Sequence, residues 1–168
     1  TPTVMPHLHM PLQSGSDRIL QAMRRSYRTD RYLGILERAR KALPDVQITT
    51  DIIVGFPGET DELFKETFEF LHSLDVSYLH VFTYSERDNT HALTLGPVVP
   101  MTTRYERNKA LRNLSYMKMQ YFTQQHAGQT RKVLFEGHVK NGMMDGYTDN
   151  YIKITAPQKE EWVNEIVD

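Results

Sequence analysis

Three short strand-like segments organise the first half of the chain, at residues 8–12, 46–54 and 78–84. Helix-like patterns, with apolar residues at three- and four-residue spacing, lie between them. Strands that alternate with helices at this spacing are typical of a parallel sheet with right-handed crossover connections. We therefore predict an α/β fold for this half. Two such units are fewer than a closed eight-stranded barrel needs.

Local signals mark the first helices. Ser16 or Asp17 can cap a short helix, and a second helix is expected over Asp30–Leu43, where Pro44 ends it. A third helix follows the sequence GFPGE and carries acidic residues in its first turn, where the helix dipole favours them.

A long fourth helix is expected after the Gly- and Pro-rich segment 85–101. Thr103 and Glu106 form a candidate capping box, the helix reaches about His126, and Gly128 is its C-terminal stop. Its predicted buried stripe consists of Ala110, Leu111, Leu114, Met117 and Tyr121.

The pattern changes to period two after residue 128. TRKVLFEG and GYTDNYIKITAP alternate like strands, with a turn at Asn141 and Gly142, and EWVNEIVD resembles the start of a third strand. We expect two domains, at residues 1–127 and 128–168, the second being part of a small β-barrel.

The strand-to-helix turn VGFPGET is a candidate ligand site, because a Gly-rich turn exposes backbone amides beside the positive end of a helix. It is neither a GxGxxG motif nor a P-loop, since no Lys follows its second Gly. A tight connection without a ligand would have the same sequence. Asp51, inside the preceding strand, is costly to bury alone and is expected to face a polar cavity or a bound hydroxyl or amine.

Two other segments carry polar groups whose role the residues leave open. Gln13 and Ser14 end the first strand, at the sheet edge where α/β proteins bind ligands, but they could equally cap and turn the chain. Arg24 and Arg25 end the first helix, where cations are favourable for structural reasons alone.

Composition excludes several kinds of chemistry. The chain has no cysteine, so it provides no disulfide, no thiolate zinc site and no ligand for an iron–sulfur cluster. Its seven histidines are scattered, and no Ser–His–Asp set or close carboxylate pair is apparent. No apolar run is long enough to span a membrane, and we expect a cytoplasmic protein.

The last segment combines basic and aromatic side chains, as single-stranded RNA-binding surfaces do. An ordinary solvated sheet has a similar composition. The residues concerned are Arg131, Lys132, Lys140 and Lys153, with Phe135, Tyr147 and Tyr151.

The order of the motifs HLHMPLQSGSDRILQAMRRSY, TTDIIVGFPGET and LHVFTYSERDNTHA, followed by a long helix and a basic β segment, closely resembles the radical S-adenosylmethionine methylthiotransferases. Within them it looks most like the MtaB type, which modifies N6-threonylcarbamoyladenosine beside the tRNA anticodon. Thr83, Asn89 and His91 depart from that pattern. The alternatives are the MiaB type, which acts on isopentenyladenosine, the RimO type, which acts on a ribosomal protein, and a non-catalytic RNA-binding module.

The resemblance implies the second half of a radical-enzyme partial (βα) barrel, followed by the opening strands of a TRAM domain, a small RNA-binding β-barrel. It implies S-adenosylmethionine and two [4Fe–4S] clusters as cofactors and tRNA as partner. Because the cluster ligands lie outside these residues, we expect this chain to be part of a longer enzyme and inactive alone. The resemblance identifies no catalytic residue and no metal ligand in these residues. Exposed strand edges are expected to favour self-association of the chain.

The resemblance also suggests which residues contact the cofactor. The backbone of Val54, Gly55 and Phe56 is expected beside the adenosyl group, and Arg25, in the pattern M-x-R-x-Y, is expected to bind the carboxylate. The other residues expected to line the cofactor site are Gln13, Ser14, Asp51, Phe82 and Tyr84.

Overall fold

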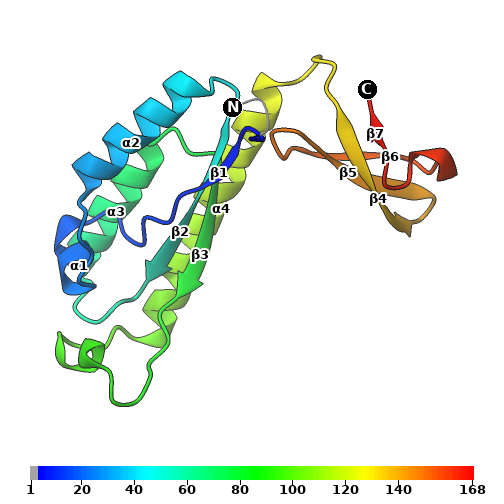
Figure 1. The fold of residues 1–168 in the computed structure, drawn as a ribbon. Coiled ribbons are helices and arrows are strands. Elements are labelled where there is room, and N and C mark those ends of the chain that lie inside the picture. The colour runs from blue at the N-terminus through cyan, green and yellow to red at the C-terminus, as the bar shows by residue number, and fades with distance from the viewer. Residues whose placement is uncertain (1–3) are drawn as a thin grey trace.

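The computed structural model describes residues 4–168, which form a larger α/β part and a smaller β part (Figure 1). The larger part contains a three-stranded parallel sheet in the order β1-β2-β3. Its elements are β1 His7–His9, α1 Asp17–Ala22, α2 Thr29–Ala42, β2 Gln47–Val54, α3 Asp61–Ser73, β3 Tyr78–Thr83, the 3-10 helix His91–Thr94 and α4 Met101–Gln125.

All four helices pack on one face of the parallel sheet. That face carries Ile48, Ile52 and Leu79, which share one buried core with apolar residues of each helix. Among residues 4–168, no helix packs on the opposite face, whose residues include Thr49, Asp51 and their β3 neighbours Tyr78 and His80. A sheet covered by helices on one side only is the arrangement of a (βα) barrel rather than of a three-layered fold. The uncovered face therefore corresponds to the interior of such a barrel.

The two edges of this sheet differ. At β3, Ser115 of α4 accepts a hydrogen bond from the Leu79 N–H at 2.9 Å and donates one to the Leu79 carbonyl at 3.0 Å. Asn108 of α4 donates to the Val81 carbonyl at 3.3 Å. At the other edge, β1 pairs only with β2 among residues 4–168. The α4 side chains thus end the sheet at β3, whereas its β1 edge is open to a further strand.

Two details of the α4 prediction are wrong. The helix begins at Met101 after Pro100 and has no side-chain N-cap, so Thr103 and Glu106 form no capping box. Met117 and Tyr121 are more than half exposed. The buried face of the helix instead includes the polar residues Arg104, Arg107 and Ser115. Their side chains form hydrogen bonds with backbone groups of neighbouring segments. The C-terminal stop is confirmed by the left-handed φ of +80° at Gly128.

The smaller part is an antiparallel sheet in the order β6-β5-β4-β7. The Asn141-Gly142 turn is confirmed, with φ values of +54° and +73°. Phe135 stacks on Trp162, with ring centroids 5.2 Å apart, inside a small apolar core. The segment EWVNEIVD forms a 3-10 turn and only a two-residue strand. The elements are β4 Val133–Lys140, β5 Met143–Thr148, β6 Lys153–Pro157, the 3-10 helix Glu160–Trp162 and β7 Ile166–Val167.

The predicted fold class is confirmed: a parallel α/β sheet is followed by a curled antiparallel sheet. A register shift between Phe135 and Val139 bends β4, as a bulge does in small barrels. Within residues 4–168, every helix is too short or too polar to cross a membrane.

Candidate functional site

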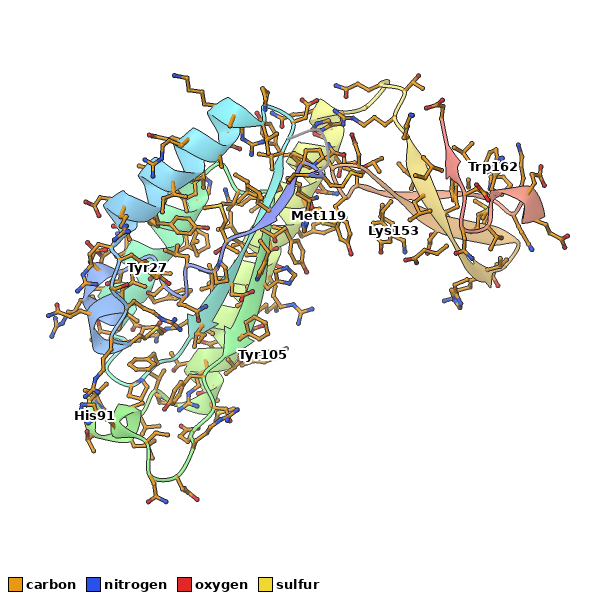
Figure 2. The ribbon with its side chains drawn as sticks, viewed as in Figure 1. Tyr27, His91, Tyr105, Met119, Lys153 and Trp162 are labelled. Atoms are coloured by element: carbon orange, nitrogen blue, oxygen red, sulfur yellow. The ribbon has the colours of Figure 1, made fainter. Side chains whose placement is uncertain are left out.

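A cavity of about 270 Å³ lies where β2 and β3 end, at the carboxyl edge of the parallel sheet. It brings together three of the predicted cofactor residues, Arg25, Phe56 and Tyr84. The Phe56 and Tyr84 rings meet edge to face, with centroids 5.3 Å apart. Ile53 and the 3-10 helix at His91 complete the wall, and Figure 2 shows His91 at this end of the molecule. The cavity thus joins a cation to aromatic and apolar surface.

The GFPGE turn beside this cavity is held by a buried carboxylate. Glu59 is 4% exposed, accepts the Gly55 N–H at 2.9 Å and accepts Arg107 Nη1 at 2.7 Å. Burial raises the pKa of the Glu59 carboxyl, and the hydrogen bonds from Gly55 and Arg107 oppose that rise. Glu59 therefore holds the turn in place through buried contacts. The sequence alone suggested no such role for this residue.

Arg104 supports the same turn from α4. It is 1% exposed, and its Nε and Nη1 donate to the carbonyls of Val99 at 2.8 Å and Tyr84 at 2.9 Å. Gly55 has a φ of +78°, and a Cβ there would lie 2.4 Å from Arg104 Cγ. Arg104 also pairs with Glu86, and its hydrogen bonds lower the pKa of that carboxyl to about 2. Arg104 thereby sets the position of the Tyr84 backbone at the cavity.

Two arginines with free side chains, Arg24 and Arg25, line this cavity. Each side chain is exposed and forms no ion pair or hydrogen bond with any residue from 4 to 168. Tyr27, two residues later, instead donates its hydroxyl to the Leu12 carbonyl at 3.1 Å. Of the M-x-R-x-Y pattern, the arginine is thus available to a ligand, whereas the tyrosine anchors the segment after β1.

The residues of the QSG segment before α1 make contacts within the protein. Ser14 is fully buried, lies 3.2 Å from Thr67 Oγ1 and accepts the Ser16 N–H, so it lies apart from the cavity. A Cβ at Gly15 would come within 2.9 Å of the Thr67 backbone, which explains the glycine. Gln13 has a φ of +79° and bridges to Ile52 of β2.

The middle of the uncovered face carries a row of polar side chains. Asp51 Oδ2 lies 3.2 Å from His9 Nε2, and His9 Nδ1 lies 2.9 Å from Thr49 Oγ1. His80 meets the His9 ring edge-on at 5.3 Å. Asp51 thus has a partner that the sequence did not suggest. Phe82, farther along β3, is 53% exposed on this face.

A second and larger pocket, of about 520 Å³, lies at the amino ends of the strands, between the two parts of the chain. Three stacked rings line this pocket. The ring centroid of Tyr151 lies 4.6 Å from that of His7 and 4.7 Å from that of Tyr147. Figure 2 shows Met119 of α4 and Lys153 of β6 on opposite sides of this junction. Sequence reasoning missed the pocket because its histidines and tyrosines come from three distant segments, at residues 7–9, 78–80 and 147–151.

The predicted RNA-binding residues are dispersed. Arg131 forms an ion pair with Asp45 at 2.9 Å, which ties the smaller part to the α2–β2 loop, and a second with Asp149 at 3.0 Å, within the smaller part. Phe135 is 4% exposed in the core of the β part. Lys132 and Lys140 are exposed on β4 and its approach, whereas Tyr147, Tyr151 and Lys153 line the junction pocket.

Comparisons with known proteins agree with this arrangement. Residues 3–71 match the Radical SAM superfamily. The chain is 50% identical over 148 residues to the tRNA-2-methylthio-N(6)-dimethylallyladenosine synthase of Clavibacter michiganensis, covering 88% of this chain and 28% of that protein. The synthase of the same name from Endomicrobium trichonymphae is 40% identical over 162 residues, covering 96% of the chain and 38% of the protein.

A third synthase of this name, from Kineococcus radiotolerans, is 56% identical over 116 residues, or 67% of the chain and 23% of the protein. The chain thus spans well under half the length of these relatives. Their name refers to dimethylallyladenosine, so the comparisons favour the isopentenyladenosine alternative over the expected threonylcarbamoyladenosine type. Residues 3–71 thus match the Radical SAM superfamily, and most of the chain is similar to part of these tRNA-modifying synthases.

Proposed function

We propose that this chain is part of an enzyme that adds a methylthio group to N6-dimethylallyladenosine in tRNA. The observation that carries the proposal is the 50% identity over 148 residues to a synthase named for that product. The aligned length is 88% of the chain, too long to be confined to either the α/β part or the β part.

The carboxyl-edge cavity suits part of S-adenosylmethionine. Its carboxylate requires a cation, and Arg25 presents an unpaired guanidinium there. Its adenine requires aromatic or apolar surface, which Phe56, Tyr84 and Ile53 offer. When bound, S-adenosylmethionine supplies the methyl group and the radical chemistry of this family. The chain's own residues bind and orient it.

The remaining predicted contacts belong to the same proposal. Gly55 has no side chain, so the backbone from Val54 to Phe56 is open to close approach, and Gln13 lies on the neighbouring strand end. Asp51 and Phe82 face the barrel interior, farther from the cavity. The iron–sulfur clusters do not fit these residues, because the chain has no cysteine, and their ligands are proposed to lie elsewhere in the enzyme.

tRNA is the proposed partner. Lys140 at the end of β4 and Lys132 just before its start are exposed cations, suited to phosphate contacts. Such contacts position an RNA without reading its sequence.

The proposal is tested by mass spectrometry of tRNA nucleosides from cells in which the parent gene is deleted and then restored. The expected result is loss and return of the methylthio group on dimethylallyladenosine. Loss on threonylcarbamoyladenosine instead would move the enzyme to that type, and no change in either nucleoside would contradict the proposal.

A further inference from the structure

The junction pocket is lined by an amide that has no hydrogen-bond partner within residues 4–168. Gln47, the first residue of β2, is 5% exposed and lies in the pocket wall. Its side-chain oxygen and nitrogen are not among the buried polar atoms that lack a partner, so the amide remains accessible from the pocket. An amide offers an acceptor and two donors side by side, which suits the edge of a nucleobase such as adenine. The side-chain oxygen and nitrogen of Gln47 are therefore free to bind a ligand in the pocket.

Tyr151 is held in a backbone conformation that disfavours a tyrosine. Its φ is +65°, where glycine or asparagine is usual, yet the turn is firmly built. Thr148 Oγ1 accepts the Ile152 N–H at 2.9 Å and pairs with the fully buried Asn150. A strained residue kept by its surroundings points to a use for its side chain.

That side chain is the centre of the His7–Tyr151–Tyr147 stack, and it remains 53% exposed. Every nucleobase has a face that can extend such a stack. Lys153 also lines the pocket, and although its ammonium lies 2.7 Å from Asp145, that group has further donors. The pocket thus combines ring faces, a free amide and a cation.

We infer that the junction pocket binds an unpaired RNA nucleotide, with its base on the tyrosine stack, its edge at Gln47 and its phosphate near Lys153. The inference rests on the proposed function and deepens it. The eight residues of β2 separate this pocket from the carboxyl-edge cavity by about 23 Å, at the usual rise per strand residue. The nucleotide held here is therefore not the one that is modified. It fixes the position of the tRNA across both parts of the chain.

The test is equilibrium binding of an anticodon stem-loop RNA to the full-length protein at fixed salt, without S-adenosylmethionine, followed by fluorescence anisotropy. Tyr151→Gly removes the ring and relieves the strain, so thermal stability should be equal or higher while RNA binding weakens roughly 5- to 150-fold. Tyr151→Phe, which keeps the ring, should bind like the wild type. Tyr105→Ala removes an exposed tyrosine from α4, outside the pocket, and should also leave binding unchanged.

Gln47→Leu tests the amide separately. It should not lower stability, because the Gln47 amide has no hydrogen-bond partner within residues 4–168, but it should weaken binding of oligo(A) more than oligo(U). Wild-type affinity in Tyr151→Gly, or an equal loss in Tyr105→Ala, would overturn the inference while leaving the proposed function intact. Failure of the wild-type protein to bind the stem-loop would overturn both.

Discussion

The two ends of the parallel strands are built in different ways. At the carboxyl end, the cavity is lined by short segments at residues 22–25, 53–56, 84 and 91–95, most of which lie in motifs that the sequence marked, and buried arginines of α4 hold the backbone in place. At the amino end, the pocket is made by side chains from β1, β2, β3, α4 and the β part. A site whose segments each carry a recognisable motif can be located from sequence, whereas a site made of side chains outside such motifs appears only in the fold.

The largest expected effect comes from breaking the buried ion pair that supports the carboxyl end. Arg107→Met leaves Glu59 buried without its partner, so the free energy of unfolding should fall by about 3–5 kcal/mol in urea denaturation. Arg112→Met, an exposed arginine on the same helix, should change it by less than about 0.5 kcal/mol. Adding Glu59→Gln to Arg107→Met should recover part of the loss, and no recovery would show that the pair is not the cause.

A smaller effect is expected at Gly55. Gly55→Ala meets both an unfavourable φ of +78° and the Arg104 side chain, so it should destabilise the protein by about 2 kcal/mol or more. Gly128→Ala has a similar φ of +80° but no atom within 4 Å, so about 1 kcal/mol is expected. Equal losses in thermal denaturation would mean that the close approach of Arg104 is unimportant.

At the cavity itself the effect should appear in ligand affinity rather than in stability. Arg25→Ala removes one of the two free guanidinium groups at the cavity, the one in the M-x-R-x-Y pattern, and should weaken S-adenosylmethionine binding about tenfold or more, measured by calorimetry. Thermal stability should be unchanged. Arg18→Ala removes an exposed arginine of α1 outside the cavity, and its affinity should match the wild type. A similar loss in both variants would contradict a specific carboxylate contact.

The smallest effect concerns Glu86, whose pKa is lowered to about 2 mainly by its hydrogen bond to Arg104. A carboxyl with a depressed folded-state pKa stabilises the protein above its unfolded value near 4.5, and that contribution is lost as pH falls toward 2. Glu86→Gln should therefore reduce stability slightly at neutral pH and flatten its slope between these values. An unchanged slope in pH-dependent denaturation would exclude the pair as a contributor.

Sequence patterns predicted the strand–helix alternation and most element boundaries, and the resemblance suggested Arg25, Phe56 and Tyr84, which line the carboxyl-edge cavity. They failed on α4, because Arg104, Arg107 and Ser115 are buried for the sake of backbone groups that only the fold brings near. They also missed His7, His80 and Gln47. These residues become neighbours only through the register of β1, β2 and β3, and the β5–β6 turn packs against them to complete the pocket. Local periodicity carries no information about contacts between residues that are distant in sequence.

The most direct measurement is a two-ligand titration of the full-length protein and its Arg25→Ala and Tyr151→Gly variants, with S-adenosylmethionine and an anticodon stem-loop RNA. If the two strand ends serve different ligands, Arg25→Ala should lose cofactor affinity and keep RNA affinity, and Tyr151→Gly should do the reverse. Parallel loss of both ligands in either variant, or loss of neither, would contradict this division.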